Sequence, residues 1–178
     1  GDRVKNWITL NEPWEHGCFG YVMGKHAPGK MKPWRFLDVM HHQFLAHGLG
    51  VQKIREHCAE AQIGITLSFT PVYPKTNSSK DKQAAQIANE FINFITLDPI
   101  IKGHYPKTLW KKFGWFKADI QNGDWDIIQS PIDFIGINNY SREFAHHSPW
   151  VPFLNAWIED GGEVPDCDFV KNGVQHTS

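Results

Sequence analysis

The chain has 178 residues, with 18 Lys and Arg against 19 Asp and Glu and a formal net charge of −1. This length is usual for one domain, and the balanced, dispersed charge provides no basic field for nucleic acid. No apolar run approaches the roughly 20 residues that a membrane-spanning helix needs, so we expect neither nucleic acid nor a membrane as a partner.

The first predicted element is a strand over residues 7–11, which is followed by Glu12 and Pro13. Its apolar and β-branched residues favour a buried strand, and Pro13 prevents the hydrogen-bond ladder from continuing. The strand would present the Glu12 carboxyl group at its C-terminal tip, where barrel enzymes keep their catalytic residues. A partly desolvated Glu in an aromatic setting suits a general acid. The alternative is a Glu that leaves the sheet and forms a surface salt bridge.

The rest of the chain alternates between helical and strand patterns. Apolar residues recur at three- and four-residue steps in the predicted helices, whereas short apolar runs mark the predicted strands. In chain order, we predict an irregular connection over 14–34, a helix over 36–58, a strand over 63–69, a helix from Ser78, a short helix after Pro106, one helical turn at 126–129, a strand over 133–139 and a loop after Ser148.

The helix from Ser78 has a recognisable start and a predicted end. Ser78 and Asp81 have the spacing of a capping box, in which the first side chain accepts a hydrogen bond from the backbone of the second. Pro99 lacks a backbone donor and should end this helix.

Strands that alternate with helices imply right-handed crossovers and a parallel sheet, which is an α/β fold. Three strands are too few to close a barrel of eight. We therefore expect a partial TIM (β/α)8 barrel with three parallel strands and crossover helices. The chain begins at Gly1 rather than Met, so we expect its true N-terminus to lie upstream. Residues 1–178 would form one incomplete domain that is rich in loops over 146–178.

Three widely spaced cysteines, Cys18, Cys58 and Cys167, suggest free thiols in a reducing compartment, so we expect a cytoplasmic protein. There is no C-x-x-C or H-E-x-x-H pattern, and His41 and His42 are adjacent on a helix and should diverge, so we expect no metal. Because no Gly-rich phosphate loop follows a strand, we expect no bound nucleotide.

The motif T-L-N-E-P-W around Glu12 resembles the acid/base motif of glycoside hydrolase family 1, the β-glucosidase family. Further matches occur in the family's order and make the resemblance clear over residues 1–145. They are G-Y followed by G-K-H-A-P-G (20–29), H-Q-F-L-A-H-G (42–48), F-I-T-L-D-P-I-I-K-G-H-Y-P (94–106) and D-F-I-G-I-N-N-Y-S (133–141). The resemblance implies the region of the fourth to sixth barrel strands.

The resemblance also implies residue roles. Glu12 would be the general acid and then the base, and Asn11 would bind the sugar 2-hydroxyl. Asn138 would line the same subsite, and Tyr140 would hydrogen-bond the nucleophilic carboxylate. Trp14 would lie where the leaving group stacks. The family has Tyr in place of Asn139, whose side chain should point away from the site.

The resemblance implies a retaining β-glycosidase that acts on small β-glucosides or oligosaccharides without a cofactor. Such an enzyme needs a second carboxylate roughly 5 Å from the first, but the chain lacks the family's T-E-N-G nucleophile motif. We therefore expect the 178 residues alone to be inactive. Two alternatives are a 6-phospho-β-glucosidase of the same family and a non-catalytic, glycosidase-like sugar-binding module. The sequence does not specify an oligomeric state.

Overall fold

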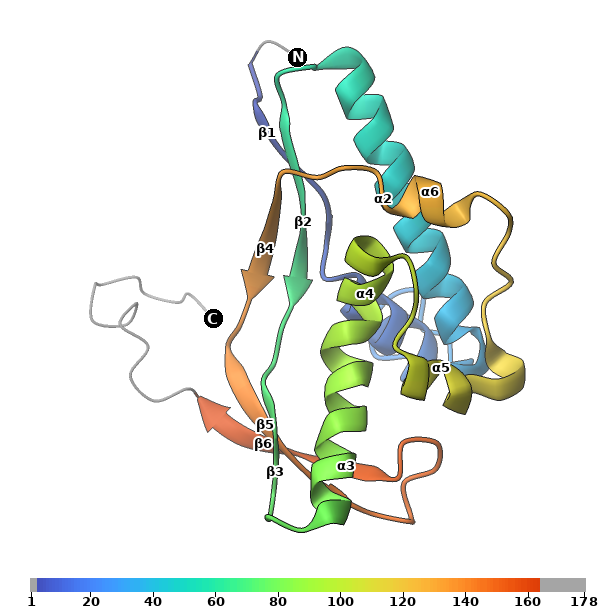
Figure 1. The fold of residues 1–178 in the computed structure, drawn as a ribbon, viewed down its shortest axis with the longest axis vertical. Helices are drawn as coiled ribbons and strands as arrows, with labels where there is room; N and C mark the ends of the chain where they lie inside the picture. Colours follow the sequence, from blue (N-terminus) through green and yellow to red (C-terminus); the bar gives the residue numbers. More distant parts are fainter. Residues whose placement is uncertain (1–2, 164–178) are drawn as a thin grey trace.

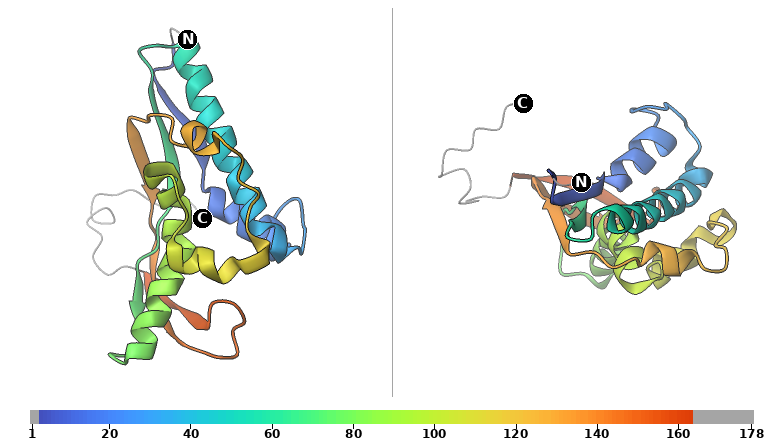
Figure 2. Two further views of the ribbon diagram at one scale, coloured as in Figure 1. Left: turned by 45° about the vertical axis from the view of Figure 1, so that its right-hand side comes forward. Right: turned by 90° about the horizontal axis from the view of Figure 1, so that it is seen from above.

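The central feature of the fold is a three-stranded parallel sheet. A computed structural model describes residues 3–163, and helices in the connections between the strands cover one face of the sheet (Figures 1 and 2). The predicted arrangement of three parallel strands with crossover helices is confirmed, and the predicted strand limits are correct to within one residue. The strands lie in the order β1-β2-β4, with bounds Asn6–Asn11, Gln62–Ser68 and Phe134–Asn138.

The two faces of this sheet differ in what they contact. Ile65 and Leu67 of β2 are fully buried and share one core cluster with Met40 and Phe44 of the long helix α2 (Phe36–His57). Because side chains alternate along a strand, Thr66 and the other even-numbered residues of β2 point to the opposite face. One face of the sheet therefore forms the core with the helices, and the opposite face carries the even-numbered side chains of β2.

The second long helical segment starts as predicted but does not end as predicted. Ser78 caps helix α3 (Ser79–Asn89), and its side chain accepts a hydrogen bond from the Asp81 backbone. A π-helical stretch over Glu90–Phe94 then leads directly into α4 (Ile95–Lys102). Pro99 lies inside α4, so the prediction that it ends the helix is wrong. A Pro inside a helix removes one intrahelical hydrogen bond, but α4 continues past Pro99, and the actual stop is Gly103, whose positive φ of 68° suits glycine.

A small second sheet lies beyond the C-terminal tips of the first. It has the order β3-β5-β6, in which β5 and β6 pair antiparallel (Figure 1). The prediction of loop after residue 148 is wrong over Ala156–Glu163, which form β6. The rest of the predicted loop, residues 164–178 with Cys167, lies outside the described residues. Strands β3 and β5 span Val72–Pro74 and Ser141–His147.

The connections contain additional short helices. The stretch over 14–34, predicted to be irregular, contains helical turns, whereas the short helices predicted after Pro106 and near residue 126 are present. Within residues 3–163, no helix is long and apolar enough to cross a membrane. The remaining bounds are α1 Pro13–Glu15, a π-helix at His16–Val22, 3-10 turns at Pro33–Arg35 and Gly114–Phe116, α5 Lys107–Phe113 and α6 Asp124–Ile128.

Two glycines of α2 provide a matched test of how closely it packs against α6. A Cβ atom on Gly48 would lie 1.9 Å from the Ile127 carbonyl oxygen, whereas a Cβ on Gly50 would have Thr9 Cγ2 as its nearest neighbour at 3.7 Å. We expect Gly48→Ala to lower the free energy of unfolding by about 1–3 kcal/mol, as overpacking does. Gly50→Ala should raise it by about 0.5–1 kcal/mol through helix propensity. Urea unfolding measures both, and equal effects at the two positions would contradict the close contact.

Candidate active site

The C-terminal tip of β1 places Glu12 in an unusual backbone conformation. The residue has φ 50° and ψ 59°, in the left-handed region that costs a non-glycine residue about 1–3 kcal/mol. Its backbone N–H donates to the Thr66 carbonyl oxygen at 2.9 Å, which ties the tip of β1 to β2. Pro13 then begins helix α1. The register of β1 against β2 also shifts between Ile8 and Asn11. Backbone strain of this kind is characteristic of functional sites.

Asn138 joins the predicted residues across the sheet. Its side-chain amide donates to Glu12 Oε1 at 2.7 Å and to Asn11 Oδ1 at 3.2 Å. The contacts link residues that are 126 and 127 positions apart in the sequence. Three of the five predicted site residues therefore meet at one point, the carboxyl ends of the parallel strands.

Strand register explains why these side chains share a face. Asn11 is paired with Thr66, and Ser68 is paired with Asn138. Paired residues of neighbouring strands, and residues two apart along a strand, point to the same side. Asn11, Ser68 and Asn138 therefore lie on the face opposite the helix-covered core, the face that would form the interior of a closed barrel. Asn139 follows the alternation and donates instead to the Phe69 carbonyl oxygen at 2.7 Å.

Tyr140 and Trp14 are the other two predicted site residues. Tyr140 lies between β4 and β5, and its side chain is 62% exposed. Trp14 donates from its indole nitrogen to the Phe91 carbonyl oxygen at 2.8 Å. Its ring meets those of Phe19 and Phe91 edge-on, with centroids 5.8 and 5.7 Å apart. These contacts fix Trp14 against the π-helical turn before α4.

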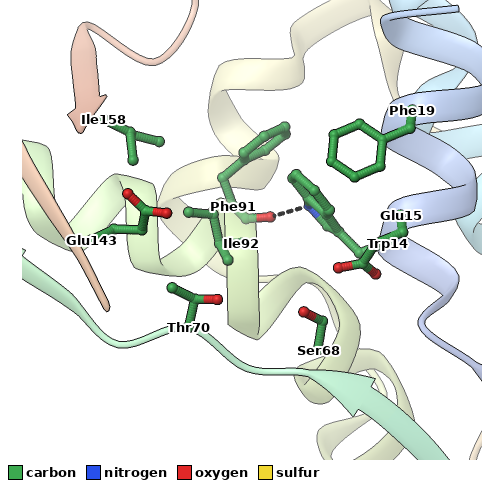
Figure 3. Close-up of a pocket in the computed structure, with 9 residues that line it drawn as sticks. All are labelled: Trp14, Glu15, Phe19, Ser68, Thr70, Phe91, Ile92, Glu143 and Ile158. Atoms are coloured by element: carbon green, nitrogen blue, oxygen red, sulfur yellow. Dashed lines mark hydrogen bonds between the residues drawn. The ribbon is translucent and has the colours of Figure 1, made fainter. Parts of the chain in front are cut away.

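Trp14 lines a pocket of about 310 Å³ that sequence reasoning did not foresee (Figure 3). The pocket lies between α1, the end of β2 and the second sheet. Its walls combine aromatic rings, aliphatic side chains, two hydroxyl groups and two carboxyl groups. The lining residues are Trp14, Glu15, Phe19, Ser68, Thr70, Phe91, Ile92, Glu143 and Ile158.

The two carboxyl groups of this pocket are partly desolvated. Burial raises the pKa of Glu15, an effect that the nearby Ser68 hydroxyl partly offsets. Burial, assisted by the nearby Asp160 carboxylate, also raises the pKa of Glu143. No sequence signal pointed to Glu15 beyond its position three residues after Glu12.

The adjacent histidines His41 and His42 have separate structural partners. His41 donates from Nε2 to Asp124 Oδ2 at 2.9 Å, and its Nδ1 lies 3.0 Å from the Tyr105 hydroxyl. His42 bonds instead to the Asp38 carbonyl oxygen, so the two neighbours diverge as predicted. Within residues 3–163, no three His, Cys, Asp or Glu side chains are grouped to hold a metal ion. Cys18 is a buried, free thiol.

Comparison with known proteins identifies the family. The sequence profile of Glycosyl hydrolase family 1 matches residues 1–159. Over 152 residues the chain is 39% identical to Beta-glucosidase A of Acetivibrio thermocellus. The matched region covers 84% of this chain and 34% of that protein. Over 153 residues it is 35% identical to an aryl-phospho-β-D-glucosidase of Bacillus subtilis, covering 84% and 32% of the two proteins.

Solved structures agree with this assignment. The Thermotoga maritima family 1 glycoside hydrolase, complexed with a cyclophellitol analogue transition state mimic, matches with a TM-score of 0.84 and 32% identity, over 89% of this chain and 36% of that one. The chain thus spans about a third of the length of the relatives it matches. Its three-stranded sheet corresponds to part of their TIM barrel, which confirms the predicted partial barrel. The chain belongs to glycosyl hydrolase family 1.

Proposed function

We propose that this chain carries the acid/base half of the active site of a retaining β-glycosidase that removes terminal β-D-glucosyl residues. The observation that carries the proposal is the contact of Asn138 with Glu12, 2.7 Å apart at the tips of parallel strands. Active sites of (β/α)8 enzymes lie at this end of the barrel. Membership of the β-glucosidase family supports the reaction class.

Glu12 acts twice in this mechanism. The amide of Asn138 donates to Oε1, which makes that oxygen the poorer site for a proton, so the acidic proton resides on Oε2. Glu12 first gives this proton to the departing glycosidic oxygen and then, as a carboxylate, takes one from water. The left-handed backbone and the Asn138 contact hold the carboxyl group in position, and such pre-organisation lowers the barrier.

The neighbouring residues support binding of the sugar. Asn11 hydrogen-bonds the 2-hydroxyl group, a contact that strengthens at the oxocarbenium-like transition state. Asn138 lines the same subsite. Tyr140 hydrogen-bonds the nucleophilic carboxylate, which the complete enzyme supplies from outside this sequence, because no T-E-N-G motif occurs in it. Trp14 places the leaving group in the pocket beside α1.

A 6-phospho-β-glucosidase is the second candidate, because an aryl-phospho-β-D-glucosidase is among the relatives at 35% identity. The motif Asn11-Glu12-Pro13-Trp14 favours the non-phosphorylated class, because in the phosphoglucosidases the Glu is usually followed by Ile or Met. The complete enzyme should therefore hydrolyse 4-nitrophenyl β-D-glucoside with a higher kcat/KM than its 6-phosphate.

Proton NMR of the first product tests the retaining mechanism in the complete enzyme. The β-anomer of glucose should appear first, and the α-anomer should follow by mutarotation, because two inversions at the anomeric carbon preserve its configuration. Initial release of the α-anomer would contradict a retaining mechanism. A faster reaction with the 6-phosphate would favour the second candidate. Binding of glucosides in calorimetry without any turnover would identify a sugar-binding module instead.

A further inference from the structure

The pocket beside α1 places carboxyl groups opposite aromatic rings. Figure 3 shows Glu143 on one side and Trp14, Phe19 and Glu15 on the other, with Phe91 between them. The rings of Phe19 and Phe91 both meet Trp14 edge-on, which fixes the aromatic wall. A ligand in this space would contact ring faces or edges and at least one carboxyl group at the same time.

Within the described part of the chain, neither Glu15 nor Glu143 takes part in an ion pair with a positively charged group. Glu15 Oε2 is buried and has no hydrogen-bond partner. A desolvated carboxylate without a counter-charge is costly, so a ligand that brings a positive charge gains more there than it would in water.

The pocket adjoins the proposed acid. Glu15 follows Glu12 by three residues, and the two carboxyl groups lie within electrostatic reach of each other. Ser68 lines the pocket with Glu15 and is paired in register with Asn138, which donates to Glu12. The leaving group of the substrate, once it has received a proton from Glu12, would therefore pass Glu15 as it departs.

We propose that Glu15, together with Glu143 across the pocket, is a specificity-determining residue that selects leaving groups carrying a protonated amine. The ammonium group sits between the two carboxylates, and the Trp14, Phe19 and Phe91 rings add cation–π attraction. Leaving groups with hydroxyl groups in the same place gain hydrogen bonds but no charge compensation. This inference rests on the proposed function, because it requires the pocket to receive the leaving group.

Three aryl β-D-glucosides of similar shape test the inference in the complete enzyme. They carry a 4-aminomethyl, a 4-hydroxymethyl or a 4-ethyl substituent on the phenyl ring, which separates charge from hydrogen bonding and from size. The measured quantity is the ratio of kcat/KM for the aminomethyl substrate to that for the ethyl substrate. We expect this ratio to fall by about tenfold in Glu15→Gln, and by a smaller factor in Glu143→Gln, because each change removes a charge and keeps the shape.

Asp160→Asn is the matched control, because it removes a charge beside Glu143 from a residue that does not line the pocket. It should change the ratio by less than about twofold. Acidification should also erase the amine preference of the unmodified enzyme, because protonation of the two carboxyl groups removes their charge. Circular dichroism shows whether each variant is folded. The ratio of kcat/KM values is evaluated separately for Glu15→Gln and for Glu143→Gln.

Each outcome has a defined meaning. An unchanged ratio in folded Glu15→Gln and Glu143→Gln overturns the inference while leaving the proposed function intact. An equal preference for the hydroxymethyl and aminomethyl substrates also overturns it, because the pocket would then recognise a hydrogen-bond donor rather than a charge. Failure of the complete enzyme to hydrolyse all three substrates instead overturns the proposed function, and the inference with it.

Discussion

Glu12→Gln in the complete enzyme should lower kcat/KM for cellobiose by about 10²–10⁴-fold, the usual contribution of a general acid. The sugar leaving group of cellobiose is a poor one that needs a proton as the bond breaks. Dinitrophenolate needs none, so kcat/KM for 2,4-dinitrophenyl β-D-glucoside, which reports the first step, should change by less than about tenfold. The amide keeps the shape of the side chain and removes only its acid and base functions.

The second step provides an independent check on Glu12. Without a base to activate water, the glycosyl-enzyme of the Gln variant should accumulate and give a burst of dinitrophenolate. Azide needs no base and should restore turnover by forming β-glucosyl azide. The control is Glu60→Gln, which makes the same change at an exposed position after α2 and should behave as the unmodified enzyme. Equal loss on both substrates would contradict the acid/base role.

The 178-residue chain on its own should show no hydrolysis of 4-methylumbelliferyl β-D-glucoside, whereas the complete enzyme should be active. Retention requires a second carboxylate about 5 Å from the acid, on the other side of the sugar. The nucleophile motif of the family is absent from this sequence. Without the nucleophile, proton donation alone cannot form the glycosyl-enzyme, so the expected loss is complete at the sensitivity of a fluorescence assay.

A carboxyl group to consider as a substitute is that of Glu15, within electrostatic reach of Glu12. It lies on the helical turn directly after Glu12 and lines the pocket beside α1 together with Ser68. The contradicting result is turnover by the purified chain that disappears in both Glu12→Gln and Glu15→Gln. Turnover that survives Glu12→Gln would instead point to a contaminating glycosidase, which a preparation from a glucosidase-deficient host would remove.

Features that depend on residues close together in the chain could be predicted from the sequence. The three parallel strands and α2 were predicted to within one residue, because apolar periodicity reports which side of an element is buried. Ser78 was correctly predicted as a helix cap, since capping is a contact between residues three apart. The choice of Glu12 as the candidate acid, which stays a prediction, also came from local chemistry, a carboxyl group between a strand and a proline.

Features that depend on distant contacts were missed or wrong. Residues of β6 resembled a loop because of Gly161 and Gly162, but a Cβ on Gly161 would lie 2.7 Å from the Arg142 carbonyl oxygen. Glycine is needed there because strand β5 passes so closely, and no local pattern reveals that neighbour. Pro99 was taken as a stop because the π-helical turn before it, which restarts the helix at Ile95, has no sequence signal.

The sequence by itself determined the family, the parallel α/β architecture and the identity of the candidate acid, because all three are encoded in short motifs and in periodicity. Only the tertiary structure decided that Asn138 reaches Glu12 from a strand 126 positions away, and that Glu15, Ser68 and Glu143 enclose one pocket with Trp14. The physical reason is that strand register, which is set by packing over the whole sheet, fixes which distant side chains share a face.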